Sequence, residues 1–165
     1  MYTGNPTPKF CPACARPLAQ RQVDGLERLA CPEASCGFVF WDNPLPVVAG
    51  LVEHQDHVLL IQNQGWPAHW WGLVTGFLER GESPQQGMLR EVREELNLDA
   101  TLQGLIGVYA FPPRNQVVMA FHLTASGPFS PGPELAAVKP VPIAKLKPWD
   151  SATGQAVADW LAGRG

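Results

Sequence analysis

The sequence predicts an α/β protein, an α/β/α sandwich with a mixed sheet that is preceded by a small N-terminal zinc ribbon. Three observations predict this arrangement. Four cysteines form two close pairs before residue 37. Short apolar, β-branched runs lie on both sides of an amphipathic helical segment at 84–96. A second helical segment closes the chain, and strands around a central helix are typical of layered α/β folds. We expect the ribbon at residues 1–40 and the second domain at 41–165.

Composition sets limits on the class of protein. The chain has 165 residues, of which 45% are hydrophobic, enough for one domain with a small appendage. The net charge of −3 argues against a general binder of nucleic acid or anionic membranes. No apolar run approaches the length of a membrane span, and the first residues lack a signal-peptide pattern. We therefore expect a cytoplasmic protein without a membrane partner.

The four cysteines, Cys11, Cys14, Cys31 and Cys36, are spaced like zinc ligands. Two short loops that each present two thiolates suit tetrahedral Zn²⁺. Two disulfides or four unrelated thiols are the alternatives; a cytoplasmic setting disfavours the first, and the clustering disfavours the second. A site with four thiolates is closed, so this zinc is expected to support the ribbon and not to contact substrate.

Charge in the ribbon gives little support for nucleic-acid binding. Residues 1–40 carry four basic and three acidic side chains: Lys9, Arg16, Arg21 and Arg28 against Asp24, Glu27 and Glu33. The resulting net of +1 is not an electrostatic footprint for a phosphate backbone. Nucleic acid is therefore an unfavoured partner.

The other elements follow from local patterns in chain order. We expect ribbon strands at 26–30 and 37–41, a hinge at 42–46, a hairpin of strands 47–53 and 57–62, a strand at 71–78, the helix at 84–96, strands at 101–111 and 116–125, a weaker strand at 138–143, and a final helix from Asp150 or Ser151 to about Ala162, ended by Gly163.

The helix at 84–96 combines a helix start with a carboxylate cluster. Ser83 is a good N-cap, and Pro84 suits the first helical position. Glu91, Glu94 and Glu95 fall within an arc of roughly 100°, beside an apolar stripe. Like charges at this spacing destabilise a helix by roughly 0.2–0.5 kcal/mol per pair, and a divalent cation would offset this repulsion. The alternative is a solvated acidic face.

The stretch 76–98 resembles the Nudix box, the signature of hydrolases that act on a nucleoside diphosphate linked to another moiety. The matching residues are Gly76, Glu82, Arg90, Glu91, Val92, Glu94, Glu95 and Leu98. The last glycine of the pattern is replaced by Asn97, the next best residue for a left-handed helix C-terminus. With the flanking strands, the resemblance extends over roughly residues 42–150 and implies a Nudix-type fold.

The resemblance also implies roles for these residues. The ligands of a catalytic Mg²⁺ or Mn²⁺ would be Glu91, Glu94, Glu95 and the backbone carbonyl of Gly76, with Glu82 holding the loop and binding an outer metal ion. Arg90 would orient a glutamate of the helix. The general base would be a box glutamate or Glu134 from a distant loop, although Glu134 could equally be an exposed loop acid. Many relatives carry a second acid three residues later, where this chain has Ala137.

The resemblance favours ADP-ribose or FAD as substrate, cleaved to AMP and a second phosphorylated product. Pro113 fits a position of ADP-ribose enzymes, whereas 109–114 does not match the element that follows the box in NADH pyrophosphatases. Four aromatic residues near the box, Trp66, Trp70, Trp71 and Phe111, could stack on a ring or pack in the core. NADH pyrophosphatase activity, a non-catalytic nucleotide sensor and an RNA-end hydrolase are the alternatives. Relatives of this type also imply a homodimer.

Overall fold

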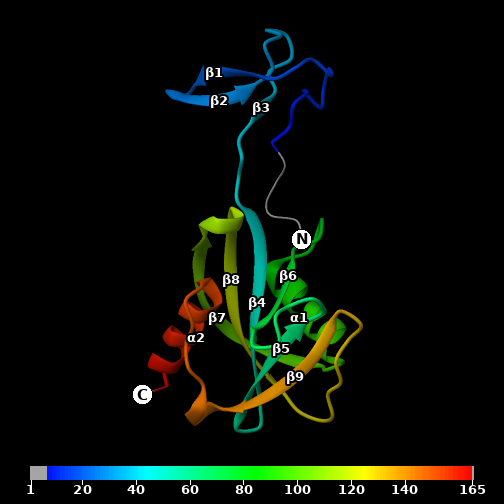
Figure 1. Ribbon diagram of the computed structural model, residues 1–165, viewed down its shortest axis with the longest axis vertical. Coiled ribbons are helices and arrows are strands. Elements are labelled where there is room, and N and C mark those ends of the chain that lie inside the picture. Colours follow the sequence, from blue (N-terminus) through cyan, green and yellow to red (C-terminus); the bar gives the residue numbers. More distant parts are fainter. Residues whose placement is uncertain (1–6, 165) are drawn as a thin grey trace. The chain divides into compact units, whose positions relative to one another are not determined.

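The computed structural model describes residues 7–164 and divides at Pro44 into two compact units (Figure 1). The first unit is the cysteine-containing segment, and the second begins at Leu45. Each unit has its own sheet. No helix among the described residues is long and apolar enough to cross a membrane.

The first unit contains a three-stranded antiparallel sheet of β1 (Ala19–Val23), β2 (Leu26–Ala30) and β3 (Val39–Phe40). The strand β1 was not predicted, because its mostly exposed residues show no apolar alternation. The signal that could have found it is the Asp24-Gly25 turn, where both residues have positive φ (52° and 78°), the requirement of a tight hairpin. The strand β3 is shorter than the predicted 37–41 because Gly37 is left-handed (φ 68°).

The second unit is built on a six-stranded mixed sheet, as predicted. Its strands are β4 (Leu45–His54), β5 (His57–Asn63), β6 (Val74–Phe77), β7 (Ala100–Phe111), β8 (Gln116–Ala125) and β9 (Leu135–Pro142). Their order is β7-β8-β4-β5-β9, and β6 also pairs with β4. The β4–β8 pair is parallel, and the other pairs are antiparallel.

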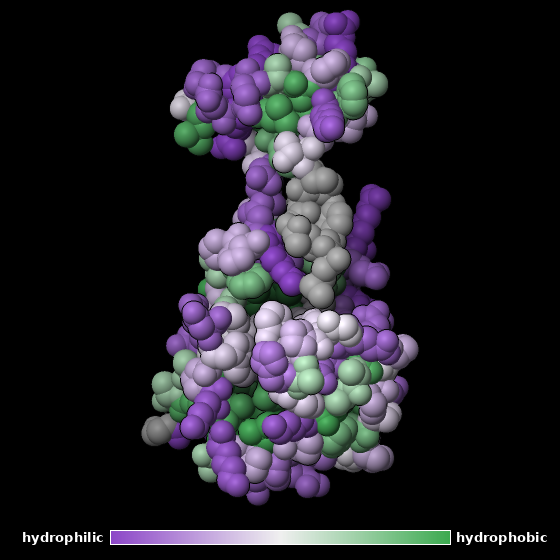
Figure 2. All heavy atoms as spheres, viewed as in Figure 1, coloured by the Kyte–Doolittle hydropathy of each residue, from purple (hydrophilic) through white to green (hydrophobic). Residues whose placement is uncertain are grey.

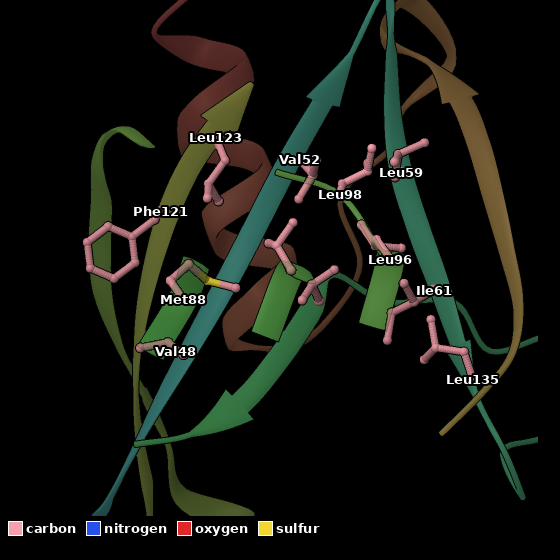
Figure 3. Packing of buried hydrophobic residues seen from close by; sticks show 12 residues of the cluster. Val48, Val52, Leu59, Ile61, Met88, Leu96, Leu98, Phe121, Leu123 and Leu135 are labelled. Atoms are coloured by element: carbon pink, nitrogen blue, oxygen red, sulfur yellow. The ribbon is translucent and has the colours of Figure 1, made fainter. Parts of the chain in front are cut away.

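Two helices, α1 (Pro84–Leu96) and α2 (Ala152–Ala162), lie on opposite faces of this sheet (Figure 1). Alternation along β4 explains why. Val48 and Val52 pack in one core cluster with Met88 of α1 (Figure 3), whereas Leu51 packs in another with Val157 of α2. Because β4 is buried on both faces, it reads as a continuous apolar run. The α/β/α sandwich is confirmed.

Several predicted boundaries need correction. The predicted hinge 42–46 is too long, because Leu45 already pairs with Gln116 as the first residue of β4. The predicted strand 71–78 shrinks to β6, which starts at Val74. The strand β9 starts at Leu135, earlier than the predicted 138, and contains Pro140. A proline is tolerated there because β9 is at an edge of the sheet.

The helix α1 begins and ends as predicted. The Ser83 hydroxyl accepts the Gln86 backbone N–H (3.3 Å), and the Gln86 side chain accepts the Ser83 N–H (2.8 Å), which completes a capping box. At the other end, Asn97 is left-handed (φ 52°), and its N–H donates to the Arg93 carbonyl. Asn97 therefore fills the terminating position that a glycine usually occupies.

Candidate active site and metal centre

The four cysteine sulfurs of the first unit come together. All lie within 4.8 Å of one another, and the Cys11–Cys36 and Cys14–Cys31 sulfurs are 3.5 Å apart. Sulfurs around a tetrahedral Zn²⁺ are separated by about 3.8 Å. The four cysteines are free thiols and form no disulfide. Their geometry and chemistry fit a four-thiolate zinc site.

Two loops of similar shape present these sulfurs. The N–H of Cys11 donates to the Arg16 carbonyl (2.8 Å), and the N–H of Cys31 donates to the Phe38 carbonyl (2.9 Å). Each pair is followed by a left-handed residue, Ala15 (φ 59°) after the first and Gly37 (φ 68°) after the second. The left-handed residue turns the backbone back after the second cysteine, so both thiols of a pair point inward.

Without a cation, the thiols shift one another's pKa values in different directions. Burial raises the pKa of Cys11, but hydrogen bonds from the backbones of Ala13 and Cys14 and from neighbouring thiols outweigh it and lower that pKa to about 7. The backbone of Phe38 lowers the pKa of Cys36, but the hydrogen bond with Cys11 and burial outweigh it and raise that pKa to about 12. Burial also raises the pKa of Cys31. A bound divalent cation is what would keep all four as thiolates.

In the second unit, β6 carries Gly76 against the carboxylate of Glu91 on α1. A Cβ atom built on Gly76 would lie 1.8 Å from Oε1 of Glu91. A side chain at this position would displace the Glu91 carboxylate, so glycine is favoured by this close approach and not by its φ angle. The backbone of β6 at Gly76 and the Glu91 carboxylate are therefore in close contact.

Arg90 connects three acidic residues of the box, Glu82, Glu91 and Glu94. Its Nε and Nη2 donate to the two carboxylate oxygens of Glu82 (3.1 and 2.8 Å), and Nη2 also donates to the Phe77 carbonyl (3.1 Å). Nη1 donates to Glu91 (2.8 Å) and to Glu94 (3.0 Å). The bidentate pair with Glu82 is the strong form of such contacts, and it lowers the pKa of Glu82. Arg90 thus fixes the loop before α1 and two carboxylates on the helix.

Glu95 is the acidic residue that Arg90 does not contact. Its side chain is 6% exposed, and Oε2 has no hydrogen-bond partner. Burial, together with the charges of Glu91, Glu134 and Glu94, raises its pKa to about 8. A buried carboxylate without a partner is costly, and a divalent cation beside it removes the cost. The acidic residues therefore fit a Mg²⁺ or Mn²⁺ site.

Glu134 lies on the loop before β9 and is close enough for its charge to act on the helix carboxylates. It raises the pKa of both Glu91 and Glu95. The structure thus places Glu134 near the carboxylates of α1, but among the described residues only the four cysteines bring three or more potential metal-ligand atoms within 4.8 Å of one another. The four cysteines form a separate cluster in the first unit.

The aromatic residues near the box differ in exposure. Trp71 packs against the α2-side core, and Phe111 also packs there. Trp66 is half-buried, and its ring lies next to Gly72. Trp70 is 54% exposed and contacts the His69 ring edge-on. Among these four, Trp70 offers the most free ring surface.

Comparison with known proteins identifies the family of the second unit. A model of the NUDIX domain matches residues 43–161. The chain belongs to the Nudix family. The predicted Nudix hydrolase is thereby confirmed at the level of the family, and the match includes the whole box and Glu134.

Relatives and solved structures agree with this family. The chain is 30% identical over 127 residues to an NAD-capped RNA hydrolase, NudC, of Stutzerimonas stutzeri (strain A1501), covering 76% of this chain and 45% of that protein. It is 34% identical over 74 residues to an ADP-ribose pyrophosphatase of Methanocaldococcus jannaschii, covering 44% of each chain. A crystal structure of a NUDIX hydrolase from Nitrosomonas europaea is similar over 94% of this chain and 92% of that one, with a TM-score of 0.79 and 29% identity. The chain spans less than half the length of these two curated relatives.

Sequence reasoning missed two contributors to the site. Gln64 donates its side-chain amide to the Pro133 carbonyl (2.7 Å), next to Glu134. Gly132 donates its N–H to the Glu95 carbonyl (2.7 Å). Neither belongs to a recognisable motif, because their relevance depends on a contact between segments far apart in the chain.

Proposed function

We propose that this protein hydrolyses the pyrophosphate bond of a nucleoside diphosphate derivative, most simply ADP-ribose or FAD, and releases AMP with a second phosphorylated product. The observation that carries the proposal is the arrangement around Arg90, where one guanidinium holds three carboxylates beside a buried fourth, Glu95. A structural acidic helix face has no need of the unpartnered buried carboxylate.

In this proposal Glu91, Glu94, Glu95 and the Gly76 carbonyl hold Mg²⁺ or Mn²⁺, with Glu82 contributing to an outer ion. Such ions supply a nucleophilic water at neutral pH and stabilise charge on phosphoryl oxygens. Arg90 keeps Glu91 and Glu94 oriented. The attacking water forms a bond to one phosphorus, the bond to the bridging oxygen breaks, and the proton of the water passes to a carboxylate, Glu134 or a box glutamate.

A second candidate is a nicotinamide dinucleotide end, in free NADH or on a capped RNA. It is favoured by the likeness to an NAD-capped RNA hydrolase over three quarters of this chain. That likeness also makes RNA a candidate partner, whereas the weak charge of the ribbon predicted that nucleic acid is not one. A sensor without catalysis is disfavoured, since the chain retains every box glutamate.

The other parts of the proposal concern the whole protein. We propose structural Zn²⁺ in a ribbon at residues 1–40, a hydrolase domain at 41–165, a homodimer and a cytoplasmic location. The clustered sulfurs support the zinc. Elemental analysis for zinc and light scattering for the dimer are the direct measurements.

The test is a substrate screen with Mg²⁺ or Mn²⁺, in which ADP-ribose, FAD, NADH and NAD-capped RNA are offered and AMP or the released nucleotide is separated by chromatography. Glu91→Gln and Glu94→Gln should each lower kcat on the order of a hundredfold. Glu79→Gln is the matched control, because Glu79 contacts Glu82 through its backbone N–H and not through its carboxylate. Tight nucleotide binding without product would contradict hydrolysis and indicate the sensor.

A further inference from the structure

The loop that carries Glu134 is held in place from two sides. On one side, the Gly132 N–H donates to the Glu95 carbonyl, and a Cβ atom at Gly132 would lie 2.1 Å from the Glu94 carbonyl oxygen. The loop backbone therefore lies directly on the last turn of α1. The contact fixes the base of the loop relative to the metal-binding carboxylates.

Gln64, directly after β5, holds the loop from the other side. Its backbone N–H donates to the carbonyl of Glu134 (2.9 Å), and its side-chain Nε2 donates to the carbonyl of Pro133 (2.7 Å). The two bonds hold two consecutive peptide groups of the loop from one residue. Rotation of these peptides would swing the Glu134 side chain, so Gln64 limits where that carboxylate can lie.

We propose that Gln64 is a positioning residue for the reaction, one that acts by holding Glu134 against the acidic site. This inference rests on the proposed function and deepens it. Three features support it together: Gln64 is exposed, so its bonds are not needed to satisfy a buried core; both of its bonds end on the Glu134 segment; and the same loop is bonded to the last turn of α1 through the Gly132 N–H and the Glu95 carbonyl (2.7 Å).

The test replaces Gln64 by methionine, which keeps the length of the side chain and removes its donor. Gln64→Met should lower kcat about fivefold (about 1 kcal/mol of transition-state stabilisation) and leave KM and the thermal unfolding midpoint unchanged. The matched control is Gln103→Met on β7, the opposite edge of the sheet, where the Gln103 amide donates to the Thr124 hydroxyl (2.8 Å). That control should keep the wild-type kcat.

The decisive measurement is the double variant with Glu134→Gln. If Gln64 acts through Glu134, adding Gln64→Met to Glu134→Gln causes no further loss, whereas independent effects multiply. A wild-type kcat for Gln64→Met, or an equal loss in both backgrounds, would overturn the inference. Full activity of Glu134→Gln alongside an inactive Glu91→Gln would also overturn it while leaving the proposed hydrolysis intact; inactivity of the wild type on every substrate would instead remove the proposed function.

Discussion

The two units of this chain are stabilised in opposite ways. In the described part of the first unit, the buried apolar residues are Ala30 and two of the cysteines, Cys11 and Cys31. Hydrophobic residues there lie at the surface among hydrophilic ones (Figure 2), and Phe10 and Leu26 are 59% and 57% exposed. The second unit instead buries three clusters of apolar side chains around its sheet.

The comparison separates what a metal ion does in each unit. A segment with almost no core would need the proposed zinc to fold, because the ion would replace the missing burial of apolar surface. The second unit has its core without a cation, and there the acidic site lowers stability by burying Glu95 without a partner. The proposed zinc would thus support the fold of the first unit, whereas the fold of the second unit would hold the ligands of the proposed catalytic cation in place.

The largest expected effect comes from removing the proposed zinc. Cys11→Ser, or a zinc-selective chelator, should unfold the first unit, since structural zinc contributes on the order of 10 kcal/mol to small domains. The strands of the second unit should remain. Limited proteolysis followed by mass spectrometry measures this, with new cleavages expected inside residues 7–44 and none in the sheet of the second unit.

Ser35→Ala is a control in the same loop, because the Ser35 hydroxyl contacts only Glu33 in an exposed hydrogen bond (3.3 Å). It should leave the proteolysis pattern unchanged. Loss of both units on zinc removal would show that the two are not independently stable.

The next largest expected effect is a change of a few kcal/mol in the free energy of unfolding of the metal-free protein, caused by the ionisation of Glu95. Its folded pKa of about 8 lies above the ordinary value of 4.5. The stability is therefore full below pH 4.5 and falls as the pH rises through 8, because ionising the buried carboxylate favours unfolding. Glu95→Gln cannot ionise, so it should unfold at higher urea concentration than wild type at pH 9 and at the same concentration near pH 4.5, while losing activity.

Glu94→Gln is the comparison for that experiment. Glu94 is 58% exposed and pairs with Arg90, so removing its charge should give no gain at pH 9. Added Mg²⁺ should stabilise the wild type and not Glu95→Gln. If Glu95→Gln were less stable at every pH, the carboxylate would have a structural partner and the metal assignment would be wrong.

The smallest expected effect is a change in the affinity of the first unit for zinc. Ala15 is left-handed (φ 59°), a conformation that costs a residue with Cβ about 1 kcal/mol relative to glycine. Ala15→Gly should therefore raise the affinity for zinc about fivefold, as measured by competition with a chromophoric chelator. Ala13→Gly, two residues earlier and without a positive φ, should not raise it.

What could be predicted from the sequence was what short segments determine. The capping box at Ser83 and the left-handed Asn97 fix α1 through contacts within the helix and its caps, so both ends were predictable. The cysteine pairs and the box were visible for the same reason. The parallel pairing of Leu45 with Gln116 was not predicted, because nothing local specifies which distant strand will be the partner.

The candidate site shows the same difference between contacts within a short segment and contacts between distant segments. The Arg90 contacts arise within one loop and one helix, and the box pattern implied them. The contact of Gln64 with the Glu134 loop joins two segments that are neighbours only after β5 and β9 have paired, from Asn63 with Leu135 onward. The complete burial of one oxygen of Glu95 likewise depends on the folded surroundings of α1.

The parallel pairing of β4 with β8 has a consequence for synthesis on the ribosome. One edge of β4 pairs with 57–58 and 74–77, but the other edge pairs only with 116–125, so the second unit cannot close its sheet until that distant strand has emerged. The three strands before residue 41 pair with their nearest neighbours in the chain and need no later segment. The strands of the first unit can therefore be complete while one edge of β4, an apolar segment, still lacks its parallel partner and exposes unpaired backbone groups.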